Sequence, residues 1–92
     1  MIKTFKNSIT ERIWNGQRVK VAADVQQKAL LKIRYIHVAK GIDDLRLPPG
    51  NNLEKLGGIR KGQYSIRVNN QYRICFRWTD NGTEDVEFTD YH

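Results

Sequence analysis

Residues 64–78 of the chain read YSIRVNNQYRICFRW, and this stretch decides the fold. Apolar side chains alternate with polar ones from Tyr64 to Val68, and they alternate again from Tyr72 to Trp78. A period of two is typical of a strand that buries one face. Asn tolerates positive φ, so Asn69-Asn70 between the two series is a candidate hairpin turn. The stretch therefore predicts two antiparallel strands joined by a tight turn.

The two faces of this predicted hairpin differ in chemistry. A further turn at Asp80-Asn81-Gly82 adds a last strand, and the apolar face then collects Ile66, Ile74, Phe76, Val86 and Phe88. The opposite, exposed face collects Arg67, Arg73 and Arg77. Guanidinium groups have a forked donor geometry that suits phosphate oxygens. Cross-strand pairing with Asp85 or Glu87 is the alternative use of these arginines.

The N-terminal half predicts a short strand and two helices. The strand covers Ile2 to Phe5. Ser8 is the predicted cap of the first helix, with Glu11 completing a capping box, and Gly16 ends that helix. The second helix covers residues 22–40, where an apolar stripe follows steps of three and four: Ala22, Val25, Ala29, Ile33 and Ile36. Lys28, Lys32 and Lys40 are expected to point away from this stripe.

The segment between the helices and the hairpin contains short elements. One more helical turn at Asp43, Asp44 and Leu45 precedes Pro48-Pro49-Gly50, which stops a helix, and Asn52 to Leu56 reads as a short strand. Helices grouped before strands favour an α+β class, with an N-terminal strand and two helices packed on an antiparallel sheet. A length of 92 residues supports a single domain over residues 1–92.

Charge is distributed unevenly along the chain. Residues 1–78 hold all sixteen Lys and Arg and five of the ten Asp and Glu, a net charge of +11. Residues 79–92 hold the other five acidic residues and no Lys or Arg, a net charge of −5. A basic body attracts phosphate polyanions, although a solvated basic face is the alternative interpretation.

Several classes of site and location are disfavoured by the sequence. Cys75 is the single cysteine, so no intramolecular disulfide forms and a reducing compartment is favoured. The first residues contain no long apolar run, which argues against a signal peptide or membrane span and predicts a soluble, cytoplasmic protein. The spacing of Cys75, His37 and His92 fits no zinc site, and no nucleotide-binding glycine loop occurs.

The last three residues place three reactive groups together. Asp90, Tyr91 and His92 supply a carboxylate, a phenol and an imidazole. An imidazole is well matched to proton transfer near neutral pH, and a phenol can stack on a base or bind a phosphate. A polar chain end without a function is the alternative interpretation.

Four segments together resemble the HigB-type toxins of the RelE/ParE superfamily: LEKLGG (53–58), GQYSIRV (62–68), QYRICF (71–76) and the final DYH (90–92). PPGN at 48–51 resembles the GraT-like branch. The resemblance implies a compact RelE-like domain that cleaves messenger RNA on the 70S ribosome. It also implies a HigA-like helix-turn-helix antitoxin, through which the toxin reaches operator DNA only indirectly.

The resemblance also implies site residues. Arg73, Asp90, Tyr91 and His92 match the family's active surface, and the expected contacts to RNA or the ribosome are Lys55, Arg60, Lys61, Arg67 and Arg77. Glu54 and Gly57 or Gly58 stand where the family often has a His and a Lys.

The chemistry of RNA sets the expected mechanism. The 2′-hydroxyl attacks the adjacent phosphorus, so neither a protein nucleophile, a metal nor a cofactor is required. Two alternatives to this nuclease remain open. One is a ParE-like toxin that inhibits gyrase, and the other is a noncatalytic module that binds the ribosome or RNA.

Overall fold

Residues 1–90, which the computed structural model describes, form two α-helices packed on a four-stranded antiparallel sheet. Helix α1 covers Ser8–Trp14 and α2 covers Ala23–Val38, and the strands β1 to β4 cover Glu54–Lys55, Tyr64–Arg67, Tyr72–Thr79 and Gly82–Asp90. Three 3-10 turns lie between α2 and β2: η1 (Ile42–Arg46), η2 (Pro49–Asn51) and η3 (Gly58–Arg60). The predicted α+β class is confirmed.

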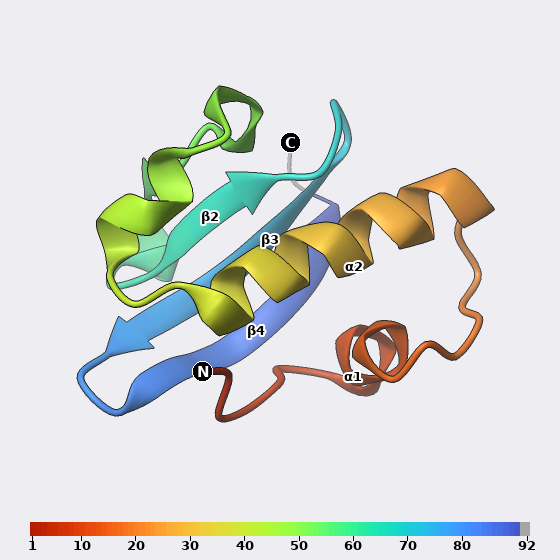
Figure 1. Cartoon of the computed structure of the whole chain (residues 1–92), viewed down its shortest axis with the longest axis horizontal. Coiled ribbons are helices and arrows are strands. Elements are labelled where there is room, and N and C mark those ends of the chain that lie inside the picture. Colours follow the sequence, from red (N-terminus) through yellow and green to blue (C-terminus); the bar gives the residue numbers. More distant parts are fainter. Residues whose placement is uncertain (91–92) are drawn as a thin grey trace.

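The strands lie side by side in chain order, and both helices cover the same face of the sheet. Helix α2 crosses that face over β3 and β4, while α1 lies beside α2 next to β4 (Figure 1). Between these layers the core is closed by fully buried side chains: Ile13, Ile33, Ile36, Ile66, Ile74, Phe76 and Val86. The apolar face predicted from the alternation is thus the face that the helices bury.

A bulge in β4 adjusts the register with β3. Cys75 lies opposite Glu87 and Arg77 lies opposite Glu84, so β4 carries one extra residue across this interval. The extra residue is accommodated at Asp85, whose φ of 54° is unusual for a residue with a side chain. The first residue of β4 must be glycine, because a Cβ on Gly82 would lie 2.7 Å from the Met1 carbonyl oxygen.

The predicted N-terminal strand is reduced to two isolated parallel bridges along β4. Ile2 pairs with Thr83 and Phe5 pairs with Val86. The side chains of Ile2 and Phe5 both pack against the core.

Three details of the helical half differ from the sequence prediction. Asn7, not Ser8, caps α1, because its Oδ1 accepts a hydrogen bond of 3.0 Å from the Thr10 amide. Helix α2 is shorter than residues 22–40, and Ala22 serves as its exposed N-cap. Lys32 is buried instead of pointing away from the core. Over residues 1–90, no helix is both long enough and apolar enough to cross a membrane.

Candidate functional site

Arg73 is fixed at the centre of the sheet's outer face, which we define as the face opposite the helices. The register pairs it with Arg67 on β2 and Thr89 on β4. Its Nε donates to Ser65 Oγ at 2.7 Å and its Nη2 donates to the Asn52 carbonyl at 2.6 Å. The prediction of an exposed arginine is wrong, since only 9% of the residue is accessible. The chain entering β1 lies against the guanidinium and covers it.

Glu54 is the carboxylate beside this arginine. Its Oε1 lies 3.8 Å from Arg73 Nη1, and 53% of its side chain is exposed. That separation is longer than a hydrogen bond, and Nη1 donates to no acceptor within residues 1–90. The pair therefore offers an unused N–H donor next to an accessible carboxylate, an arrangement suited to binding a phosphate and accepting a nearby proton.

Sequence reasoning identified Glu54 as a departure from the family pattern and missed its place beside Arg73. In the sheet, Glu54 pairs with Ser65 on β2, and Ser65 pairs with Cys75 on β3. Arg73 is two residues before Cys75 on the same strand, so its side chain lies on the same face as that of Glu54. The predicted strand at 52–56 contained the right segment. Only its pairing with β2, which the sequence did not specify, shows that Glu54 reaches the outer face.

A buried polar network fixes the loop that supplies the Asn52 carbonyl. Lys32 Nζ on α2 donates to Asn51 Oδ1 at 2.6 Å, and the Asn51 amide donates to the carbonyls of Leu45 and Leu47, both at 3.2 Å. Burial, with smaller contributions from the positive charges of Lys28 and Arg67, lowers the pKa of Lys32 from its usual value of 10.5. The helix layer thus holds in place the loop that orients Arg73.

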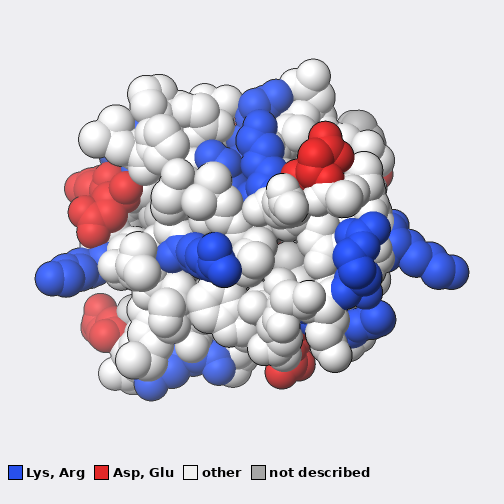
Figure 2. All heavy atoms as spheres, turned by 45° about the vertical axis from the view of Figure 1, so that its right-hand side comes forward, with Lys and Arg blue, Asp and Glu red and all other residues white. Residues whose placement is uncertain are grey.

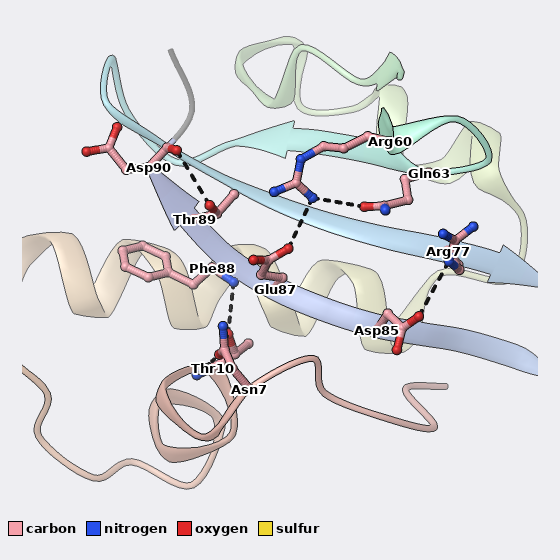
Figure 3. Close-up of polar contacts among 10 residues, drawn as sticks. All are labelled: Asn7, Thr10, Arg60, Gln63, Arg77, Asp85, Glu87, Phe88, Thr89 and Asp90. Atoms are coloured by element: carbon pink, nitrogen blue, oxygen red, sulfur yellow. Dashed lines mark hydrogen bonds and ion pairs between the residues drawn. The ribbon is translucent and has the colours of Figure 1, made fainter. Parts of the chain in front are cut away.

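Two other arginines of this face are engaged with acids on β4 (Figure 3). Arg60 Nη1 lies 3.1 Å from Glu87 Oε1 and also donates to Gln63 at 3.1 Å, so this side chain spans the outer face from η3 to β4. Arg77 Nε lies 3.4 Å from Asp85 Oδ2, in a pair that is about two-fifths exposed. Arg77 thus pairs with an acidic residue of the last strand, which was the alternative use expected from the sequence. Arg60 pairs with the same strand in the same way.

The remaining predicted RNA-binding cations differ in their exposure to solvent. Lys55 and Lys61 are exposed, and Arg67 is half-buried with its Nη2 donating to Asn70 Oδ1. Cys75 lies buried near Arg60, Glu87 and Arg73, and burial raises the pKa of its thiol. A buried thiol with a raised pKa is chemically inert.

The chain end begins next to Arg73. Asp90 closes β4 opposite Tyr72, and its Oδ2 accepts a hydrogen bond of 3.0 Å from Gln71 Nε2. The strand before it is anchored to α1, because Thr10 Oγ1 accepts from the Phe88 amide at 2.9 Å (Figure 3). Strand alternation puts Thr89 on the face of Arg73. The other two predicted catalytic residues, Tyr91 and His92, lie outside the described residues.

His37 has a structural environment. Its Nδ1 accepts from the Ile2 amide at 3.2 Å, and its ring lies 5.0 Å from that of Trp14. Both tryptophans, Trp14 and Trp78, pack against the core. In the described part of the chain, no group of three or more His, Cys, Asp or Glu could hold a metal ion.

Known proteins that this chain resembles include toxins and chains of toxin–antitoxin complexes. Residues 3–92 match the family described as HigB-like toxin, the RelE-like toxin of type II toxin–antitoxin system HigB. Toxin HigB-1 of Vibrio cholerae is 35% identical over 82 residues, which cover 87% of this chain and 86% of the relative. Among solved structures, a chain of the YoeB-YefM complex from Staphylococcus aureus aligns with a TM-score of 0.63 at 20% identity, covering 100% of this chain and 95% of that one. A chain of a heterotetrameric YoeB-YefM toxin-antitoxin complex from the same organism aligns with a TM-score of 0.58 at 18% identity, with the same coverage of both chains.

Proposed function

Because this chain belongs to the HigB-like family of RelE-like toxins of type II toxin–antitoxin systems, we propose that it is an endoribonuclease that cleaves messenger RNA on the ribosome. Its partner is an antitoxin, which we propose to be a HigA-like protein with a helix-turn-helix domain. The toxin then meets operator DNA only through that antitoxin. Activity on ribosomes requires a cytoplasmic location. Pro48-Pro49-Gly50-Asn51 favours the GraT-like branch of the family.

The observation that carries this proposal is the geometry of Arg73 and Glu54. A phosphodiester oxygen that binds Nη1 comes within reach of a carboxylate 3.8 Å from that nitrogen. The guanidinium itself is immobilised by Ser65 and Asn52, so little reorganisation is needed when charge builds up on the phosphate. A rigid cation next to an accessible base is what cleavage by an internal hydroxyl requires.

The proposed reaction is a transesterification in the RNA. The 2′-oxygen bonds to the adjacent phosphorus while its proton passes to the Glu54 carboxylate. Arg73 Nη1 stabilises the added negative charge on the phosphate. The bond from phosphorus to the 5′-oxygen breaks, and His92 donates a proton to that leaving oxygen. The products are a 2′,3′-cyclic phosphate and a 5′-hydroxyl, and no metal is needed to generate the nucleophile.

The remaining predicted residues serve binding and alignment. Tyr91 orients the substrate base, and Asp90 positions the chain end through its contact with Gln71. Lys55 and Lys61 are the exposed cations best able to contact RNA phosphates. Arg67 and Arg77 assist at the edges of the outer face, whereas Arg60 acts mainly by holding Glu87.

Primer extension on messenger RNA after brief induction tests the proposal. The variants are His92→Ala and Arg73→Lys, the second of which keeps the charge but loses the fork that reaches Ser65 and Asn52. Wild type should produce ribosome-dependent cuts, and both variants should lose them. Arg34→Gln on the exposed side of α2 is the matched control and should cut like wild type.

The alternatives give different results in the same cells. Inhibited DNA supercoiling without cuts would identify a gyrase-inhibiting toxin and refute the nuclease. Ribosome binding with neither effect would identify a noncatalytic module. Cuts that persist in both His92→Ala and Arg73→Lys would show that other residues carry the chemistry.

A further inference from the structure

An open cleft lies on the opposite side of the sheet from Arg73. It has a volume of about 620 Å³. It lies between α1, the connection from α1 to α2, and the helix-covered face of the sheet, where β3 begins at Tyr72 and β4 passes Phe88. Its apolar lining comes from Ile9, Val19, Val21, Tyr72 and Phe88. The mechanism proposed above uses none of these side chains.

The floor of the cleft is preformed and apolar. The rings of Tyr72 and Phe88 stack with centroids 4.5 Å apart, and Val19 is buried beside them. Ile9 stands at the edge with 47% of its surface exposed, although it belongs to a helix that packs on the core. An exposed apolar side chain beside a concave apolar floor is typical of a surface that binds another protein.

The rim of the cleft is cationic. Arg12, Arg18 and Lys20 line it, and none of the three forms an ion pair within residues 1–90. Two of them are held in place by backbone carbonyls, because Arg12 Nη2 donates to Arg18 O and Arg18 Nη2 donates to Val21 O, both at 3.1 Å. Lys and Arg side chains are spread over this side of the molecule, and Asp and Glu occupy fewer places on it (Figure 2).

We propose that this cleft receives an acidic amphipathic helix of the antitoxin. Apolar side chains at spacings of three and four fill the floor, and carboxylates on the flanks of the same helix meet the cationic rim. RNA supplies the negative charge but not the aliphatic side chains that the floor accommodates. The inference rests on the proposed function, since it assumes a protein antitoxin. Because Arg73 and Glu54 lie on the other face of the sheet, neutralisation through this cleft leaves that pair uncovered.

Calorimetric titration of the full-length chain with the full-length product of the neighbouring reading frame tests the proposal. Ile9→Glu and Lys20→Glu place negative charge at the floor's edge and at the rim. We expect each to weaken binding about tenfold or more, the range of residues that matter in an interface. Val38→Glu and Lys40→Glu make the same changes in charge at two exposed positions, the last residue of α2 and the second residue beyond it, and should bind within about twofold of wild type.

The outcomes separate the two proposals. Binding by wild type that Ile9→Glu and Lys20→Glu leave unchanged would overturn the cleft and leave the toxin–antitoxin function standing. Equal weakening by the control pair would also overturn it, because a general charge effect would then explain the loss. Failure of wild type to bind the neighbouring product would overturn both. Loss of binding to 70S ribosomes by the cleft variants, with antitoxin binding intact, would reassign the cleft to RNA.

Discussion

Replacing Glu54 by Gln separates the two things that this carboxylate can do beside Arg73. As a proton acceptor, Glu54 promotes cleavage, and its loss slows the reaction. As a mere counter-charge 3.8 Å from Nη1, it competes with the phosphate, and its loss speeds the reaction. Glu54→Gln preserves the shape of the side chain while removing both the charge and the basicity. The two interpretations therefore predict rate changes of opposite sign.

The size of the expected effects follows from the geometry. The pair is too long for a hydrogen bond and half-exposed on the glutamate side, so its contribution to the free energy of unfolding is at most about 1 kcal/mol. General base catalysis contributes about 10²–10⁴ in rate, equivalent to about 2.7–5.4 kcal/mol of activation free energy. We therefore expect Glu54→Gln to fold almost normally and to cleave at least about a hundredfold more slowly.

Single-turnover cleavage of a message bound to purified 70S ribosomes measures this directly, with the toxin in excess. Glu84→Gln is the matched control, because it removes another partly exposed carboxylate, on β4, that forms no ion pair within residues 1–90. Its rate should equal that of wild type. A Glu54→Gln protein that cleaves as fast as wild type, or faster, would refute the assignment of Glu54 as the base.

Three further predictions concern the scaffold around the site. Thr10→Val leaves the buried Phe88 amide without its acceptor, so it should lower the free energy of unfolding, measured in urea, by about 1–3 kcal/mol. Thr10→Ser keeps a hydroxyl and should lower it by less. A valine variant as stable as wild type would contradict this. Because the pKa of Lys32 is lowered in the folded protein, the unfolded chain binds more protons than the folded one as pH rises toward 10.5. The free energy of unfolding of wild type should therefore increase relative to that of Lys32→Met over this pH range. Parallel curves of unfolding free energy against pH would contradict this. Cys75 should resist a thiol reagent at about pH 8 in the native protein and react in urea; equally fast native reaction would show that its buried position is not maintained.

Much of the fold follows from local patterns. The alternation through residues 64–78 predicted the hairpin and the buried face, because pleated strands expose alternate side chains to a single core. The apolar stripe on α2 predicted which side of the helix is buried, but it did not predict that Lys32 is buried too. A lysine is buried here because Asn51, nineteen residues away, provides an acceptor. No periodicity within the helix carries that information.

The candidate site was predictable in part. Arg73 was placed on the correct face, but its burial depends on the Asn52 carbonyl and on Glu54, which come from β1 and the loop just before it. Ion pairs such as Arg60 with Glu87 link residues 27 positions apart and need the folded sheet to be recognised. Tyr91 and His92 are assigned from the terminal motif alone, and their roles are proposals.

The chemistry at the new RNA ends tests the central claim most directly. A message with a single 2′-deoxy nucleotide at the preferred scission point should resist cleavage on the ribosome, and the unmodified message should yield an upstream fragment ending in a 2′,3′-cyclic phosphate. A cut at the deoxy position, or an upstream fragment ending in a 3′-hydroxyl, would contradict attack by the 2′-oxygen.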